Sequence, residues 1–101
     1  MAPLELLILK SLDAGPNHGF GITLRVQEAS GGLLGVEEGS LYPALHRLEK
    51  DGALAAEWST TAAGRRARLY RLTPAGRKRL AKARKRWVAV ARGVARLLRF
   101  A

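Results

Sequence analysis

Apolar positions recur along this chain at the spacing of α-helices, with one interruption where two short strands are predicted. Almost every position from 4 to 12 is apolar, which predicts a first helix buried on more than one side. Ile22, Val26 and Ala29 repeat at helical spacing and predict the inward face of a second helix, with Asn17 as its N-cap.

A third helix is predicted by Leu41, Leu45 and Leu48, which stand at i, i+4 and i+7 and therefore form one apolar stripe. Pro43 lacks an N–H and is tolerated only near the start of a helix, so we expect this helix to begin between residues 39 and 40. Two helices, a turn and a third helix of this length predict a helix-turn-helix arrangement.

The third helix also has a polar face, which suits the recognition helix of a DNA-binding protein. Tyr42, His46 and Lys50 share a helical face away from the leucines, and Arg47 lies beside them. Side chains of these types donate and accept hydrogen bonds to base edges and phosphates. The predicted DNA contacts from this helix are Ser40, Tyr42, Pro43, His46, Arg47 and Lys50.

Strands are predicted at residues 53–60 and 65–72, around a loop with a glycine, and a shorter one at residues 33–36. The two longer runs predict a β-hairpin, which is the wing of a winged helix. Trp58 is expected to pack in the core beneath the hairpin rather than bind a ligand. The arginines of the hairpin are expected to contact DNA, or alternatively to keep an exposed strand soluble; the predicted contacts are Arg65, Arg66 and Arg68.

A long last helix should begin at Thr73 and Pro74, an N-cap followed by a first-turn proline, and run to about Arg99. Its apolar residues recur in steps of three and four across a helix otherwise rich in arginine and lysine. This seam is too short for an independent coiled coil, so we expect it to pack on a second copy of the chain and on the first helix. The seam residues are Leu80, Ala83, Trp87, Val90, Val94 and Leu97.

These elements predict a mainly α fold with a small β-hairpin: a winged helix-turn-helix at residues 1–73 and a dimerisation helix at residues 74–101. At 101 residues the chain forms a modest core that gains from a partner surface.

The charge is distributed unevenly along the chain. Residues 1–60 hold four bases and eight acids, a formal charge of −4, whereas residues 61–101 hold 14 bases and no acid. A block of this kind suits a polyanion, because neutralised phosphates release their counterions. A solvated arginine-rich surface is the alternative.

Catalytic and metal sites are not expected. His18 and His46 are the two histidines, and neither stands at metal-ligand spacing with a cysteine, a histidine or more than one acid. The chain has no cysteine, no nucleophile elbow and no phosphate-cradling glycine loop. We therefore expect no cofactor and no enzymatic activity. No secretory leader or membrane-spanning run is recognised, so we expect a cytoplasmic protein.

Three segments carry a family resemblance. The runs GPNHGFGI (residues 15–22), GSLYPALHRLEKDG (39–52) and GRRARLYRLTPAGR (64–77) closely resemble the PadR family of bacterial transcriptional regulators, in the family's order. Glu37 and Glu38 before the second run resemble its acidobacterial-type branch. Phe20 departs from the family, which most often has tyrosine after His-Gly, so a hydroxyl that could reach a phosphate is absent.

The resemblance implies a repressor that binds operator DNA as a homodimer and is relieved by a small molecule or another signal. In short members of the family, paired last helices can enclose a pocket for flat aromatic compounds, which would place an apolar effector at Trp87; dimer packing without a ligand is the simpler role for this residue. Two other functions remain open: non-specific binding of nucleic acid through the basic block, and a protein-interaction module that docks through the last helix.

Overall fold

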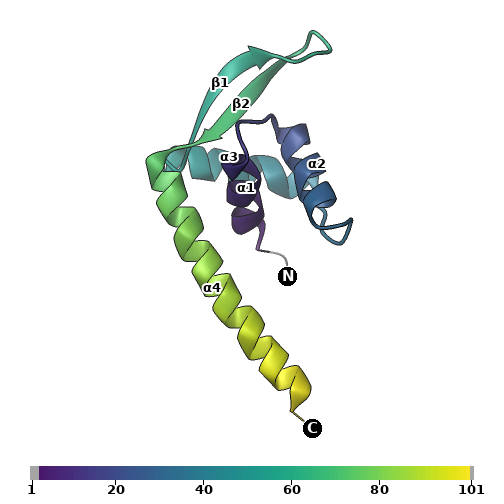
Figure 1. The fold of residues 1–101 in the computed structure, drawn as a ribbon. Coiled ribbons are helices and arrows are strands. Elements are labelled where there is room, and N and C mark those ends of the chain that lie inside the picture. Colours follow the sequence, from purple (N-terminus) through teal and green to yellow (C-terminus); the bar gives the residue numbers. More distant parts are fainter. Residues whose placement is uncertain (1–2, 101) are drawn as a thin grey trace.

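The computed structural model describes residues 3–100 as four α-helices and one antiparallel hairpin (Figure 1). The elements in chain order are α1 (Leu4–Asp13), α2 (Gly19–Ala29), α3 (Glu38–Lys50), β1 (Leu54–Thr60), β2 (Arg66–Leu72) and α4 (Pro74–Arg99). The predicted fold class is confirmed: a mainly helical winged helix-turn-helix with a long C-terminal helix. The hairpin and the far end of α4 extend from the three-helix body in opposite directions (Figure 1).

The core lies where α1, α2 and α3 meet the base of the hairpin. The leucine stripe of α3 is buried as predicted, with Leu41, Leu45 and Leu48 at most 1% exposed. Ile8 and Leu9 of α1 are also fully buried, which agrees with a first helix covered on more than one side. The remaining buried apolar residues are Leu12, Ile22, Val26, Ala44, Ala53, Leu54, Tyr70, Leu72 and Leu80.

The turn between α1 and α2 is fixed by Asn17, although not in the way the sequence predicts. Asn17 was expected to cap α2, but His18 is the N-cap residue, and the side-chain oxygen of Asn17 accepts a hydrogen bond from the backbone N–H of His18 at 2.9 Å. The backbone of Asn17 exchanges two hydrogen bonds with that of Tyr70 in β2, of 3.0 and 2.9 Å. The prediction was wrong because a distant strand supplies the partner for this residue.

Two further predictions about α2 and the segment after it are wrong. Residues 33–36 do not form a strand, because β1 and β2 pair with each other and offer this segment no partner for its backbone groups. Leu33 is 89% exposed, while Leu34 and Val36 pack at the edge of the core. Ala29, predicted to face inward, is exposed because it lies in the last turn of α2, at the open groove between α1 and α2.

The recognition helix begins at Glu38, slightly earlier than expected, so Pro43 lies in its second turn. It ends at Lys50, and Gly52 follows with φ +79°, a conformation that L residues with side chains rarely adopt. The glycine reverses the chain so that β1 can begin at Leu54.

The hairpin register separates its residues into two faces. Leu54 pairs with Leu72 and Trp58 pairs with Arg68, so these residues share one face, because alternate residues point the same way. Leu54 and Leu72 are buried at the base of the hairpin, whereas Trp58 lies on the same face farther out. The core face therefore continues outward as an aromatic and cationic face.

The last helix starts as predicted. Thr73 is the N-cap, and its hydroxyl accepts a hydrogen bond from the N–H of Gly76 at 3.0 Å, with Pro74 in the first turn. Gly76 permits close packing, because a Cβ there would lie 2.0 Å from the carbonyl oxygen of Ala53. The first turns of α4 thus pack directly on the turn between α3 and β1, and the rest of the helix extends outward.

Candidate nucleic-acid interface

The face of α3 opposite the leucine stripe is open to solvent along its whole length. All six residues predicted to contact DNA from this helix are exposed: Ser40, Tyr42, Pro43, His46, Arg47 and Lys50. The face carries hydroxyl, imidazole, guanidinium and ammonium groups, which are the donors and acceptors that read base edges and phosphates. An α-helix with its side chains is about 10–12 Å across, which fits a major groove of about 12 Å.

Tyr42 is fixed against the start of α2. A Cβ on Gly19 would lie 2.9 Å from both Cε1 and the hydroxyl oxygen of Tyr42, so the ring packs directly on the glycine backbone. Tyr42 is still 45% exposed, which leaves part of the phenol accessible from outside. Phe20, which follows Gly19 and stands where the family most often has tyrosine, is 70% exposed.

The second part of the candidate interface is the outer half of the hairpin. Arg65 and Arg66 are exposed beside a tight turn in which the N–H of Thr61 donates to the carbonyl of Arg65 at 2.7 Å. Gly64 has φ +81° within this turn, and its N–H donates to the carbonyl of Thr61. The turn thus holds two adjacent guanidinium groups at the end of the wing.

Trp58 was predicted to lie in the core beneath the hairpin, and that prediction was wrong. The side chain is 58% exposed, because the hairpin extends past the helices before the strand reaches this residue. The Cζ atoms of Arg66 and Arg68 lie 5.0 and 5.5 Å from the centre of the indole ring, within the range of cation–π attraction. Trp58 therefore orients arginines instead of filling the core.

Arg68 differs from the other wing arginines because it has an acidic partner. Its Nη2 lies 2.5 Å from Oε2 of Glu49 on α3. Arg68 is among the DNA contacts predicted from the sequence, whereas Glu49 has no predicted role. Glu49 follows Tyr42 and His46 at i+7 and i+3 on one stripe of α3, a spacing that could have drawn attention to it.

Ion pairs between the two halves of the chain reduce the contrast in charge seen in the sequence. Arg77 pairs with Asp13 at 3.4 Å, and Arg79 pairs with both Glu5 and Asp51. Together with the Glu49–Arg68 pair, these contacts occupy half of the eight acids of the first 60 residues. The basic surface that remains is concentrated on the wing and on the outer part of α4.

Buried and hydrogen-bonded groups fix the site from beneath. Burial raises the pKa of Tyr70, while the charge of Arg68 acts in the opposite direction. The carboxylates of Glu5 and then Asp51, each hydrogen-bonded to Arg79, raise the pKa of that guanidinium further. Both raised pKa values keep Tyr70 neutral and Arg79 charged at neutral pH.

The predicted seam of α4 is mostly uncovered. Trp87, Val90 and Val94 are 43–50% exposed and Leu97 is 70% exposed, whereas Ala83 is half-buried. Leu80 is only 8% exposed and belongs to the core of its own chain, so the seam that remains begins at Ala83. The start of α1 packs beside it, as expected for the first helix.

A groove of about 820 Å³ lies between α4 and the start of α1, and Trp87 contributes to its wall. Apolar residues from both helices line it together with basic ones; the lining consists of Pro3, Leu4, Glu5, Leu6, Arg79, Lys82, Ala83, Arg86, Trp87 and Val90. The only acid in that lining is Glu5, which Arg79 already pairs.

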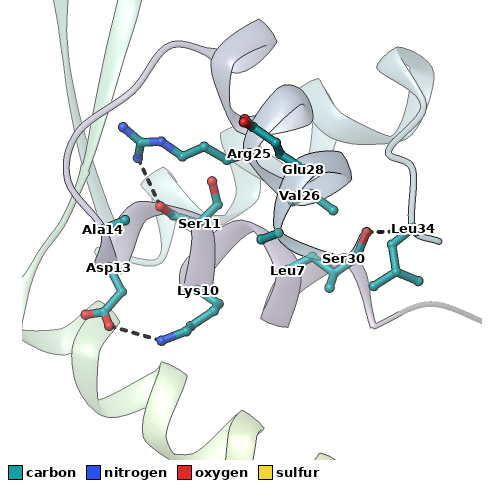
Figure 2. A pocket seen from close by; sticks show the side chains of 11 residues that line it. Leu7, Lys10, Ser11, Asp13, Ala14, Arg25, Val26, Glu28, Ser30 and Leu34 are labelled. Carbon is teal, nitrogen blue, oxygen red and sulfur yellow. Dashed lines mark hydrogen bonds and ion pairs between the residues drawn. The ribbon is translucent and has the colours of Figure 1, made fainter. Parts of the chain in front are cut away.

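A second groove, of about 710 Å³, lies between α1, α2 and the segment after α2 (Figure 2). Arg25 extends across it and donates to the carbonyls of Ser11 at 3.0 Å and Gly15 at 2.7 Å, and Lys10 pairs with Asp13 at 3.6 Å. Arg25 therefore fixes α2 on α1 and the turn that follows it, whereas the Lys10–Asp13 pair lies within α1.

Over residues 3–100, no group of three or more histidine, cysteine or acidic side chains is placed to hold a metal ion. None of the helices in that range has the length and apolar character needed to cross a bilayer.

Comparison with known proteins gives concordant matches. Residues 8–82 match the transcriptional regulator PadR-like family. The transcriptional regulator Rv3488 of Mycobacterium tuberculosis is 42% identical over 93 residues, which cover 92% of this chain and 83% of the relative.

Solved structures with the same fold include a transcriptional regulator from Clostridium thermocellum, with a TM-score of 0.80 and 26% identity over 91% of this chain and 89% of that chain. The structure of Bacillus subtilis PadR in complex with operator DNA has a TM-score of 0.71 and 25% identity, and the match covers 80% of this chain and 46% of that one.

Proposed function

The chain belongs to the PadR-like family of transcriptional regulators, and we propose that it is a sequence-specific DNA-binding repressor that acts as a homodimer. As a member of this family it is a transcriptional regulator and not an enzyme. Bacterial transcriptional regulators act on DNA in the cytoplasm, and we propose the same location for this chain.

One observation carries the DNA-binding proposal: the exposed polar face of α3 lies beside a wing that bears Arg65 and Arg66. The recognition helix would place Tyr42, His46 and Arg47 at base edges in a major groove. The wing arginines would lie along the neighbouring phosphates or in a narrow minor groove, where the negative potential is strongest. The likeness to Bacillus subtilis PadR with its operator DNA supports this arrangement.

The dimer is proposed from the uncovered seam of α4. Exposed apolar side chains along one helix gain free energy when a partner covers them, and a symmetric pair of helices buries the same residues twice. In this proposal residues 74–101 form the dimerisation helix and residues 1–73 the DNA-binding part. A dimer would set the two recognition helices about 34 Å apart, one turn of DNA.

Relief of repression is proposed to act through the same helices. A flat apolar or aromatic compound that stacks on Trp87, whose indole is partly exposed in the groove between α4 and α1, would change the angle between the two halves. The recognition helices would then no longer match successive grooves. Dimer packing of Trp87 without a ligand is the alternative in this part of the proposal.

Selection of bound duplexes from a random-sequence library, followed by sequencing, tests the main proposal. A single enriched motif with two related half-sites is expected, because a symmetric dimer reads a symmetric site. Non-specific binding through the basic surface would instead enrich no motif. A protein-interaction module would retain no duplex DNA at physiological salt.

A further inference from the structure

Four side chains form a connected series from the recognition helix to the outer wing. Glu49 of α3 pairs with Arg68 of β2, both about one third exposed, and Arg68 lies over Trp58 of β1. Arg66 lies over the same indole, with its Cζ 5.0 Å from the ring centre. Glu49, Arg68, Trp58 and Arg66 therefore connect α3 to the outer half of the hairpin.

We propose that Glu49 is a positioning and specificity-determining residue, which holds Arg68 away from phosphates and thereby lowers affinity for random DNA relative to the operator. This inference rests on the proposed function, because it concerns the same interface. It assigns a role to an acid, whereas the DNA contacts proposed above come from basic, aromatic, imidazole and hydroxyl side chains.

The position of Glu49 is the first step of the argument. It shares a stripe of α3 with Tyr42 and His46, so it lies at the border of the face proposed to read bases. A carboxylate at this border repels phosphates unless a cation neutralises it. Arg68 supplies that cation within the chain, so the pair as a whole adds no net charge to the surface.

The second step concerns the wing. With Arg68 paired and stacked on Trp58, the hairpin is held at one position relative to α3. Base contacts from α3 and phosphate contacts from the wing can then form together only in the register that the operator provides. Without Glu49, Arg68 could follow phosphates on any sequence, while the operator complex would lose the preorganised wing.

The experiment compares wild-type protein with Glu49→Gln on two duplexes, the library-selected operator and a scrambled version of equal length and composition. Fluorescence anisotropy over a salt series gives affinity and salt slope. For Glu49→Gln we expect random-DNA affinity to rise by about three- to tenfold, and its salt slope to steepen by about 0.9 because one phosphate contact is added. On the operator the added phosphate contact is offset by the loss of the preorganised wing, so operator affinity should change by less than about twofold and discrimination falls.

Glu57→Gln is the matched control, because it removes the same charge from β1, in the hairpin to which Arg68 belongs, without removing a partner of Arg68. Glu57 is exposed and pairs in register with Leu69, on the face opposite Trp58 and Arg68. It should leave the ratio of operator to random-DNA affinity unchanged. A loss of discrimination equal to that of Glu49→Gln would overturn the proposal, because any removed acid would then have the same effect.

The same Glu49→Gln change in an Arg68→Gln protein separates the release of Arg68 from simple repulsion between Glu49 and phosphates. In the Arg68→Gln protein, Glu49→Gln should no longer steepen the random-DNA salt slope, since no guanidinium is left to release. A slope that steepens equally with and without Arg68 would mean that Glu49 merely repels phosphates. An unchanged slope in the single variant would also overturn the proposal.

Failure of the proposed function gives a different result. Wild-type protein that binds both duplexes equally would refute sequence-specific binding before any variant is compared. The random-DNA series would still test the release of Arg68, because that effect needs no operator.

Discussion

Nη1 of Arg79 lies 3.0 Å from Oδ2 of Asp51, which joins the first turns of α4 to the C-cap residue of α3. Nε of the same guanidinium pairs with Glu5 on α1. One arginine thus connects three helices, and the long helix is oriented relative to α3 by a polar contact as well as by apolar packing.

Replacement of Arg79 by glutamine should therefore destabilise the fold. Its side chain is 36% exposed, so water screens both pairs, and we expect a loss of about 1 kcal/mol in the free energy of urea unfolding. Arg77→Gln is the control: that side chain is 64% exposed with one partner at 3.4 Å, and its loss should be below about 0.5 kcal/mol. Equal effects would show that Arg79 does not link the helices.

Arg47→Ala tests the recognition helix. The side chain is exposed on the polar face of α3, so folding should be unaffected. Operator binding should weaken by about 1–3 kcal/mol if the guanidinium reads a base, with a smaller loss on random DNA. Arg92→Ala is the control, because it makes the same change at an exposed position of α4. It should leave the ratio of operator to random-DNA affinity unchanged. If both variants bind the operator equally well, Arg47 does not read it.

Joint replacement of Arg65 and Arg66 by alanine tests the wing. Affinity for operator and random DNA should fall together, and the salt slope should decrease by about 0.9 for each phosphate that the wing no longer neutralises. Arg71→Ala, near the base of the hairpin and on the face opposite that of Arg66, should leave the slope unaltered. A double variant with the wild-type slope would show that the tip arginines remain in solvent.

Val94→Asp tests the proposed dimer seam. In a symmetric dimer it would bury two carboxylates near each other, which costs several kcal/mol, so the variant should sediment as a monomer and lose operator affinity. Val88→Asp is a matched control, because Val88 is similarly exposed but lies on the opposite side of α4. Dissociation by Val88→Asp alone would place the interface on that other side.

Gly76→Ala tests the seating of α4. The new methyl group would meet the carbonyl oxygen of Ala53, so we expect a loss of about 1–3 kcal/mol of stability through displacement of the helix start. Gly93→Ala on the same helix meets nothing within 4 Å and should stabilise by about 0.5–1 kcal/mol. Thermal unfolding of both variants measures the difference. A neutral Gly76→Ala would show that the two segments can separate without cost.

Much of the fold could be predicted because local patterns determine it. The spacing of Leu41, Leu45 and Leu48 identified the buried stripe of α3, and with it the polar face that we propose contacts DNA. Thr73 and Pro74 identified the start of α4, because capping depends on neighbours in the chain. The resemblance to the PadR family was carried by short motifs and is confirmed by the family match.

What the sequence by itself determined is therefore which residues are helical, which faces are apolar and where the basic residues concentrate. Only the tertiary structure decided which elements those faces meet: Trp58 lies outside the core, Asn17 bonds to Tyr70, Leu80 is covered by its own chain, and Glu49 pairs with Arg68. The physical reason is how far apart in the chain the interacting residues lie. Helical periodicity and capping act over a few residues, whereas these contacts join residues distant in the chain, and their geometry depends on how far the hairpin and α4 extend beyond the core.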